Sequence, residues 1–287
     1  MLFKKLNNEK VKCLACAHYC QIMPDKFGIC GTRQQQNGEL ASLVYCKVAA
    51  NHFDTIEKKP LYHFLPDTEI LSFGTLGCNF RCDWCQNFDI SQSPRQKNKP
   101  EFWGKKISPE AIVKLAIKNN TPSVAYTYNE PAIFIEFAHD TAKLAHSEGI
   151  KNVFVTNGYL SKESFEYIKP YLDAANVDLK SMDNKFYQRY CGARLQPVLD
   201  TIKRLQRAKI HIEITTLLIP GINDSDANLK KIAKFIADLS LKIPWHISRF
   251  FPAYKKQDVS PTPLKSLNRA EKIGRDSGLK HIYIGNI

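Results

Sequence analysis

The sequence lacks a long apolar run anywhere along its 287 residues. Residues 1–10 are rich in charge and contain no apolar stretch of the kind that a secretory signal needs. No later segment is apolar over the length of a membrane-spanning helix. The sequence therefore predicts a globular protein of the cytoplasm with no membrane partner.

The chain also lacks the features of a disulfide framework. Its nine cysteines are an odd number and fall in uneven clusters, whereas small disulfide-stabilised domains carry paired cysteines. We find no internal repeat and no low-complexity tract. Metal binding is therefore the better interpretation of the clustered cysteines.

Acidic side chains are few relative to basic ones. The chain has 41 Lys and Arg against 28 Asp and Glu, a formal net charge of +13. This excess favours acidic partners such as nucleic acid, phosphorylated substrates or an acidic protein surface. However, the lysines are scattered through the predicted helices, and no nucleic-acid-binding module is recognisable. A generally basic proteome explains the charge equally well, so RNA stays one alternative partner.

From about Ser72 onward, short β-rich runs alternate with amphipathic helical segments, a pattern typical of parallel strands joined by helical crossovers. Ser108 and Ser225 are expected to cap two of the helices. The pattern predicts an α/β fold, a partial or near-complete parallel (β/α) barrel over residues 67–287. Residues 1–66 lack the alternation and are expected to form a separate, small cysteine-rich metal-binding module. The expected strands cover residues 70–74, 123–128, 152–156, 175–179, 210–219, 245–251 and 281–284.

Polar groups follow several of these strands where each strand ends. Asn129-Glu130-Pro131, Thr156-Asn157-Gly158 and Asp178-Leu179-Lys180 come after the second, third and fourth expected strands. In parallel barrels, functional residues gather at the rim formed by the strands' carboxyl ends. The sequence therefore predicts a site at this rim.

Directly after the first expected barrel strand, Cys78, Cys82 and Cys85 form a C-x3-C-x2-C run in a loop. Three thiolates can bind three irons of a cubane cluster and leave the fourth iron to an external ligand, as in a catalytic metal site. The alternative is a structural zinc site whose fourth ligand is Cys46 or a histidine. The spacing, the preceding strand and the aromatic Trp84 before the last cysteine favour the cluster.

With these residues the sequence resembles the radical-SAM superfamily over the whole predicted barrel, and within it the proteins similar to pyruvate formate-lyase activating enzyme. Residues 57–64, Cys85-Gln86-Asn87 and residues 126–131 further resemble the radical-SAM member of the AmmeMemoRadiSam group. The resemblance implies a 4Fe–4S cluster and S-adenosylmethionine as cofactors. It implies reductive cleavage of S-adenosylmethionine to a 5′-deoxyadenosyl radical, which abstracts hydrogen from a substrate that the resemblance does not identify. It also implies a flavodoxin- or ferredoxin-like electron donor and companion proteins of the Memo and AMMECR types.

The resemblance also assigns residues to the cofactor. Asn129 and Glu130 occupy the place of a motif that binds the methionyl amine, although an ordinary helix start, capped by Asn129, explains them too. Asp178 and Lys180 match residues beside the cofactor, and a salt bridge at the rim is the alternative. Val155 stands where the activating enzymes have aspartate, which places a monovalent cation site in doubt. The cofactor-binding residues expected in this way are Trp84, Asn129, Glu130, Thr156, Asn157, Asp178, Lys180 and His246, of which Lys180 and His246 are also expected near the substrate.

A second cysteine set, C-x2-C-x3-C-x9-C, supplies four thiolates from Cys13, Cys16, Cys20 and Cys30. Such a shell suits structural zinc, which would stabilise a small module, or a second iron–sulfur cluster that relays electrons. The run lacks ferredoxin spacing, which favours zinc. His18 is a candidate substitute ligand, whereas the isolated Cys46 and Cys191 are expected to be small core residues.

Three functions remain open from the sequence. The first is a radical-SAM enzyme acting on a macromolecule, with the activating-enzyme resemblance pointing to a protein substrate. The second is a radical-SAM enzyme that modifies RNA, which only the positive charge suggests. The third is a zinc- or iron–sulfur-binding protein without catalytic activity.

Overall fold

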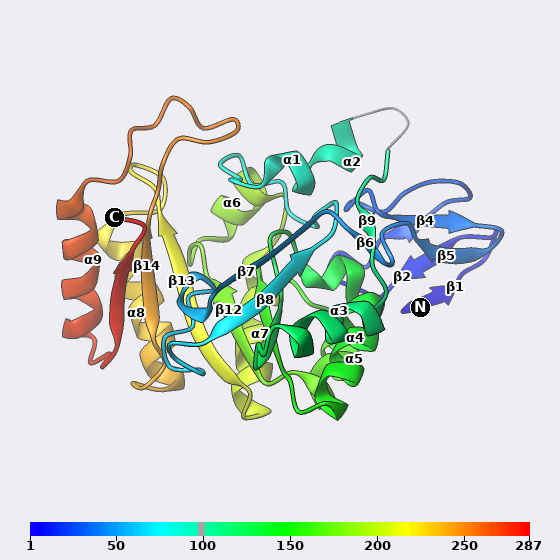
Figure 1. Cartoon of the computed structure of the whole chain (residues 1–287). Helices are drawn as coiled ribbons and strands as arrows, with labels where there is room; N and C mark the ends of the chain where they lie inside the picture. Colours follow the sequence, from blue (N-terminus) through cyan, green and yellow to red (C-terminus); the bar gives the residue numbers. More distant parts are fainter. Residues whose placement is uncertain (97–100) are drawn as a thin grey trace.

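An eight-stranded sheet forms the body of the protein in a computed structural model that describes residues 1–96 and 101–287 (Figure 1). Its strands follow one another in nearly sequential order across the sheet. From one edge to the other they are β15 (Ile282–Gly285), β14 (Trp245–Arg249), β13 (His211–Leu218), β12 (Ala174–Asp178), β11 (Lys151–Thr156), β10 (Ser123–Tyr126), β8 (Glu69–Gly74) and β7 (Ala50–Thr55).

All neighbouring strands from β8 to β15 are parallel, and only β7 runs antiparallel to its neighbour β8. Because β7 and β15 do not pair with each other, the sheet is a partial barrel, as predicted. The expected strands all occur, with ends that differ by one or two residues. The strands are buried because helical crossovers cover the sheet, which explains their near-continuous apolar character.

Helices join the parallel strands and cover the outside of the sheet (Figure 1). The side chains of Ser108 and Ser225 accept hydrogen bonds from backbone N–H groups in the first turns of α3 and α8, which confirms both predicted caps. The α-helices are α1 (Phe88–Ser91), α2 (Ser93–Gln96), α3 (Pro109–Lys118), α4 (Ile135–Ser147), α5 (Lys162–Ile168), α6 (Asn184–Phe186), α7 (Leu195–Arg207), α8 (Asp226–Leu239) and α9 (Leu264–Asp276). Short 3-10 segments are η1 (Ile56–Lys58), η2 (Pro131–Phe134) and η3 (Lys169–Tyr171), and η4 (Tyr187–Cys191) is a π-helix.

The N-terminal residues form small sheets beside the barrel, at the end opposite β15 (Figure 1). The predicted boundary at residue 66 lies too late, because Ala50–Thr55 is strand β7 of the main sheet. The module is also not separate in its packing, since Val11, Ile22 and Leu40 belong to the same buried cluster as the barrel residues. The strands outside the main sheet are β1 (Phe3–Lys5), β2 (Val11–Cys13), β3 (Gln21–Ile22), β4 (Arg33–Gln36), β5 (Glu39–Ser42), β6 (Lys47–Val48) and β9 (Lys105–Lys106).

Across residues 1–96 and 101–287, no helix combines the length and the apolar character needed to cross a membrane.

Candidate active site

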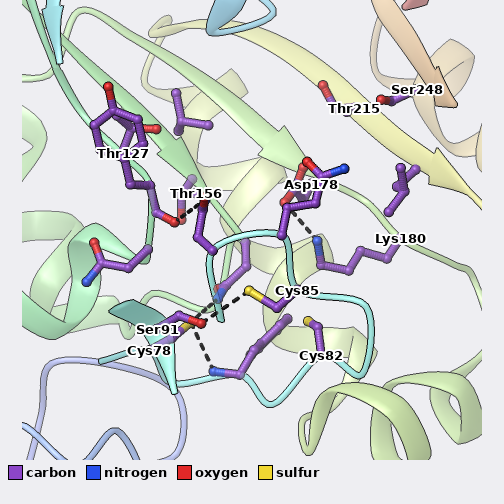
Figure 2. A pocket seen from close by; sticks show the side chains of 18 of the residues that line it. Cys78, Cys82, Cys85, Ser91, Thr127, Thr156, Asp178, Lys180, Thr215 and Ser248 are labelled. Carbon is purple, nitrogen blue, oxygen red and sulfur yellow. Dashed lines mark hydrogen bonds and ion pairs between the residues drawn. The ribbon is translucent and has the colours of Figure 1, made fainter. Parts of the chain in front are cut away.

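A cavity of about 370 Å³ opens at the carboxyl ends of the parallel strands, where the sequence predicted a site (Figure 2). The loop after β8 supplies three cysteines to its wall, and the ends of β10, β11 and β12 supply polar groups opposite them. The cavity is lined by Lys58, Lys59, Cys78, Phe80, Cys82, Trp84, Cys85, Gln86, Asn87, Ser91, Thr127, Tyr128, Asn129, Val155, Thr156, Asn157, Asp178, Lys180, Thr215, Leu217 and Ser248.

The cysteine loop is held in place by contacts on both sides. It begins at Gly77, whose φ of +87° favours glycine and whose missing side chain lets Thr32 and the Cys30 carbonyl approach closely. The backbone N–H of Phe80 donates to Cys78 Sγ at 3.4 Å, and Cys85 Sγ lies 3.2 Å from Ser91 Oγ. Figure 2 shows the three thiols at one end of the cavity.

The surroundings of the loop fit an iron–sulfur cluster. Asn79 Nδ2 is buried and has no hydrogen-bond partner among residues 1–96 and 101–287, while Asn79 Oδ1 accepts from Asn157 Nδ2 at 2.7 Å. A buried amide donor left without a partner is costly, and it lies directly after Cys78. A thiolate or inorganic sulfide at this place would accept its hydrogen bond. Cys78, Cys82 and Cys85 are therefore the residues that would hold the cluster.

Opposite charges face the cavity from the end of β12. Lys180 Nζ contacts Asp178 Oδ2 at 2.7 Å, and both residues line the wall (Figure 2). Burial alone would lower the pKa of Lys180, but Asp178 and the nearby Cys82 and Cys191 thiols raise it above its ordinary value. The ammonium thus stays charged. The predicted rim salt bridge occurs, and both of its residues line the cavity.

Glu130 lies behind the cavity wall. It is fully buried, is not a lining residue, and accepts hydrogen bonds from Thr156 Oγ1 at 2.8 Å and from the N–H groups of Asn157 at 2.7 Å and Ala132 at 3.0 Å. Burial raises the pKa of Glu130 to about 7, although these donors lower it. Glu130, and not Asn129, caps η2, with Pro131 in its first turn. Its geometry is that of a residue that positions Thr156 and Asn157, so direct contact with a methionyl amine is not favoured.

The other expected cofactor residues divide into two groups. Trp84, Asn129, Thr156 and Asn157 line the cavity, and the Asn129 amide donates to Thr75 Oγ1 at 3.1 Å and to the Gly77 carbonyl at 2.8 Å. The expected residues that line the cavity are therefore Trp84, Asn129, Thr156, Asn157, Asp178 and Lys180, whereas Glu130 and His246 lie outside its wall.

His246 lines a second cavity of about 580 Å³ next to the first. Its Nε2 lies 2.6 Å from Glu213 Oε2, and Glu213 also accepts from the backbone N–H groups of Tyr62 and His63. Burial would raise the pKa of Glu213, but hydrogen bonds from His211, His246 and these backbone groups lower it to about 2. His246 is thus engaged with a buried carboxylate and lies outside the wall of the first cavity.

Several lining residues were not singled out from the sequence. Lys58, Lys59, Gln86 and Asn87 lie in the segments that resemble the radical-SAM member of the AmmeMemoRadiSam group. This resemblance is the sequence signal that could have identified them. Thr215, Leu217 and Ser248 belong to β13 and β14. The period-2 alternation of a strand could have indicated that Thr215 and Leu217 face the same side.

Comparison with known proteins decides the family. The model of the radical SAM superfamily matches residues 73–235, more than half of the chain, and this range contains the three cysteines of the cavity. The chain belongs to the radical SAM superfamily. Membership implies a 4Fe–4S cluster and S-adenosylmethionine as cofactors.

Similar proteins indicate which kind of radical SAM enzyme this chain is. The Methanocaldococcus jannaschii protein named Uncharacterized protein MJ0808 is 42% identical, over 100% of this chain and 84% of that protein. The pyruvate formate-lyase-activating enzyme of Clostridium pasteurianum is 23% identical, over 72% of this chain and 80% of that enzyme. These similarities support an enzyme of the pyruvate formate-lyase activating kind.

Solved structures agree with this fold. A domain of pyruvate-formate lyase-activating enzyme from Bacteroides vulgatus has a TM-score of 0.50 and 25% identity, and it covers 57% of this chain and 98% of its own. A radical SAM methyltransferase from Sphaerobacter thermophilus has a TM-score of 0.59 and 16% identity, over 78% of this chain and 68% of its own. At 16% identity, the similarity to the methyltransferase concerns the fold alone.

Proposed function

We propose that this radical SAM enzyme abstracts a hydrogen atom from a protein, one segment of which enters the second cavity. The observation that carries the proposal is the continuity of the two cavities. Both are lined by Lys58, Lys59, Gln86, Thr215 and Ser248, so a group in the second cavity borders the first. The second cavity leaves room for a substrate when S-adenosylmethionine fills the first.

When bound, the cluster and S-adenosylmethionine supply a 5′-deoxyadenosyl radical that removes hydrogen from the substrate. The protein's part is binding, orientation and exclusion of water. Asp178 and Lys180 present a carboxylate and an ammonium at one wall of the cavity. This pair complements the ammonium and carboxylate of a methionyl group through charge-assisted hydrogen bonds.

Ion pairs stabilise the wall that the two cavities share. Lys59 Nζ contacts Asp54 Oδ2 at 2.7 Å and lies 5.1 Å from the centre of the Tyr128 ring. Lys58 contacts the same carboxylate at 3.3 Å but is largely exposed. Lys59 therefore fixes the wall, while Lys58 can exchange partners and contact an incoming substrate.

A protein substrate is favoured over RNA. Relatives of this chain are named as activating enzymes of pyruvate formate-lyase, of (2S)-3-sulfopropanediol dehydratase and of 4-hydroxyphenylacetate decarboxylase. Those names denote proteins as targets. The net charge of +13 is the observation that supports RNA, and it is compatible with an acidic protein surface as well.

Transfer of deuterium tests the proposal. Extracts of cells grown in deuterated medium would be fractionated and incubated without oxygen with enzyme, reductant and unlabelled S-adenosylmethionine. Mass spectrometry should find deuterium in 5′-deoxyadenosine, and this signal should disappear after protease treatment but survive RNase. The Cys82→Ala variant is the matched control. Loss of the signal after RNase would assign the substrate to RNA, and deuterium arising from a small-molecule filtrate would contradict a macromolecular substrate.

Two groups of partners belong to the same proposal. A flavodoxin- or ferredoxin-like protein would supply the electron, in keeping with the activating-enzyme relatives. Companion proteins of the Memo and AMMECR types rest on the resemblance of the motifs alone. Affinity purification from cells under anaerobic conditions, followed by mass spectrometry, tests both.

A further inference from the structure

The four N-terminal cysteines lie together in the folded chain. Cys13, Cys16 and Cys30 are buried and Cys20 is partly buried. Cys13 is the last residue of β2, Cys20 directly precedes β3, and Cys16 lies in the connection between these two paired strands.

Local pairing explains why they meet. The backbone N–H of Cys13 donates to the Cys20 carbonyl at 2.9 Å where β2 pairs with β3. A side chain at Gly28 would lie 3.8 Å from Cys20 Cβ, so the chain that leads to Cys30 passes directly beside Cys20. The chain between Cys20 and Cys30 thus folds back on itself, which brings these two cysteines together although they are separated in sequence.

The cysteine module packs directly on the loop that carries the catalytic cysteines. A side chain at Gly77, the neighbour of Cys78, would lie 2.8 Å from the Cys30 carbonyl. His18 Nε2 lies 2.9 Å from the carbonyl of Asn79, the other neighbour of Cys78. His18 therefore contacts the catalytic loop.

Arg95 bridges the same two segments from another side. Its Nη1 donates to the Ile29 carbonyl at 3.1 Å and its Nη2 donates to the Phe80 carbonyl at 2.7 Å. One guanidinium thus joins the backbone next to Cys30 to the backbone of the catalytic loop.

We propose that Cys13, Cys16, Cys20 and Cys30 hold an iron–sulfur cluster that passes single electrons to the cluster at Cys78, Cys82 and Cys85. One electron from a flavodoxin- or ferredoxin-type protein reduces the N-terminal cluster. The same electron then moves to the catalytic cluster and returns the N-terminal cluster to its oxidised state. The electron is consumed when the sulfur–C5′ bond of S-adenosylmethionine breaks. The relay rests on the proposed function, whereas the metal centre does not.

Position favours the cluster over structural zinc. A zinc site would gain nothing from lying against the catalytic loop, whereas electron transfer requires that proximity, and Cys30 and His18 both lie against the neighbours of Cys78.

Metal content tests the centre without any activity. In the triple variant Cys78→Ala, Cys82→Ala and Cys85→Ala, purified and reconstituted without oxygen, we expect about four irons and four sulfides per chain. Reduction should produce an electron paramagnetic resonance signal. Further loss of Cys13 and Cys16 should remove both iron and signal. One zinc per chain with no iron, or no bound metal, would overturn the proposal.

Comparison of two reductants tests the relay. In Cys16→Ser, 5′-deoxyadenosine formation driven by a flavodoxin should fall at least tenfold, while formation driven by dithionite should stay within about twofold of the parent. Cys46→Ser, outside both sets, is the matched control. Equal losses with both reductants, in a variant whose circular dichroism is unchanged, would overturn the relay. If Cys16→Ser does not fold, the triple variant decides whether the centre exists. A parent that cleaves no S-adenosylmethionine would instead refute the proposed function.

Discussion

Cys191 Sγ lies 3.8 Å from Cys82 Sγ, although 109 residues separate the two cysteines. The backbone N–H of Arg81 donates to the Cys191 carbonyl at 2.9 Å, which ties η4 to the cluster loop. Cys191 was expected to be an isolated core residue. It is buried as expected, but it contacts a residue that would hold the cluster.

This contact predicts an effect on the reduction potential. When Cys82 binds the cluster as a thiolate it has no proton, so the Cys191 S–H becomes the donor of this contact. Hydrogen bonds to cluster sulfurs stabilise the more negative, reduced state. Removing the thiol in Cys191→Ala should therefore lower the midpoint potential by ~40 mV, from a hydrogen bond of about 1 kcal/mol. Cys191→Ser keeps a donor and should stay near the parent. Potentiometric titration followed by electron paramagnetic resonance measures this, and equal potentials in all three proteins would remove Cys191 from the account.

Glu213 predicts how stability depends on pH. Its pKa is lowered from 4.5 to about 2, so between these values the unfolded chain binds more protons than the folded one. The stabilisation is complete above pH 4.5 and is lost as the pH falls toward 2. Glu213→Gln should lower the free energy of unfolding at pH 7 by roughly 2–3 kcal/mol and flatten this acid limb. Denaturation at several pH values checks it, with the exposed Glu166→Gln as control. An unchanged acid limb would contradict the assigned network.

Glu130 predicts a link between folding and cofactor affinity. Glu130→Gln would turn an amide N–H2 toward donors that now meet carboxylate oxygens, at a cost of about 1–3 kcal/mol in the free energy of unfolding. Because one of the two oxygens that accept from Thr156 and Asn157 is replaced by a donor, these residues are held less firmly and S-adenosylmethionine should bind more weakly. Chemical denaturation and calorimetry on the anaerobic protein measure the two effects. Parent-like values in both experiments would show that Glu130 does not position these residues.

The catalytic loop and the parallel strands were predictable because their signals are local. Three closely spaced cysteines and a β-rich run depend on neighbours in sequence, and the strand ends then bring polar residues to one rim. Thr156, Asn157, Asp178 and Lys180 were found by that rule.

The sequence did not reveal features that depend on which way a side chain points or on contacts between residues far apart in the chain. Spacing cannot tell that the carboxylate of Glu130 points behind the cavity, nor that Glu213 binds His246 and the Tyr62 backbone. The domain boundary failed because β7, at the sheet edge, has mostly exposed or half-buried side chains and lacks the apolar pattern of a buried strand.

The most direct test of the account is cleavage of S-adenosylmethionine by the pure protein. Anaerobically reconstituted protein, given a strong reductant and S-adenosylmethionine, should form 5′-deoxyadenosine, and Cys82→Ala with an intact fold should form none. A parent protein that carries its cluster yet yields no 5′-deoxyadenosine, or a Cys82→Ala variant as active as the parent, would contradict the central claim.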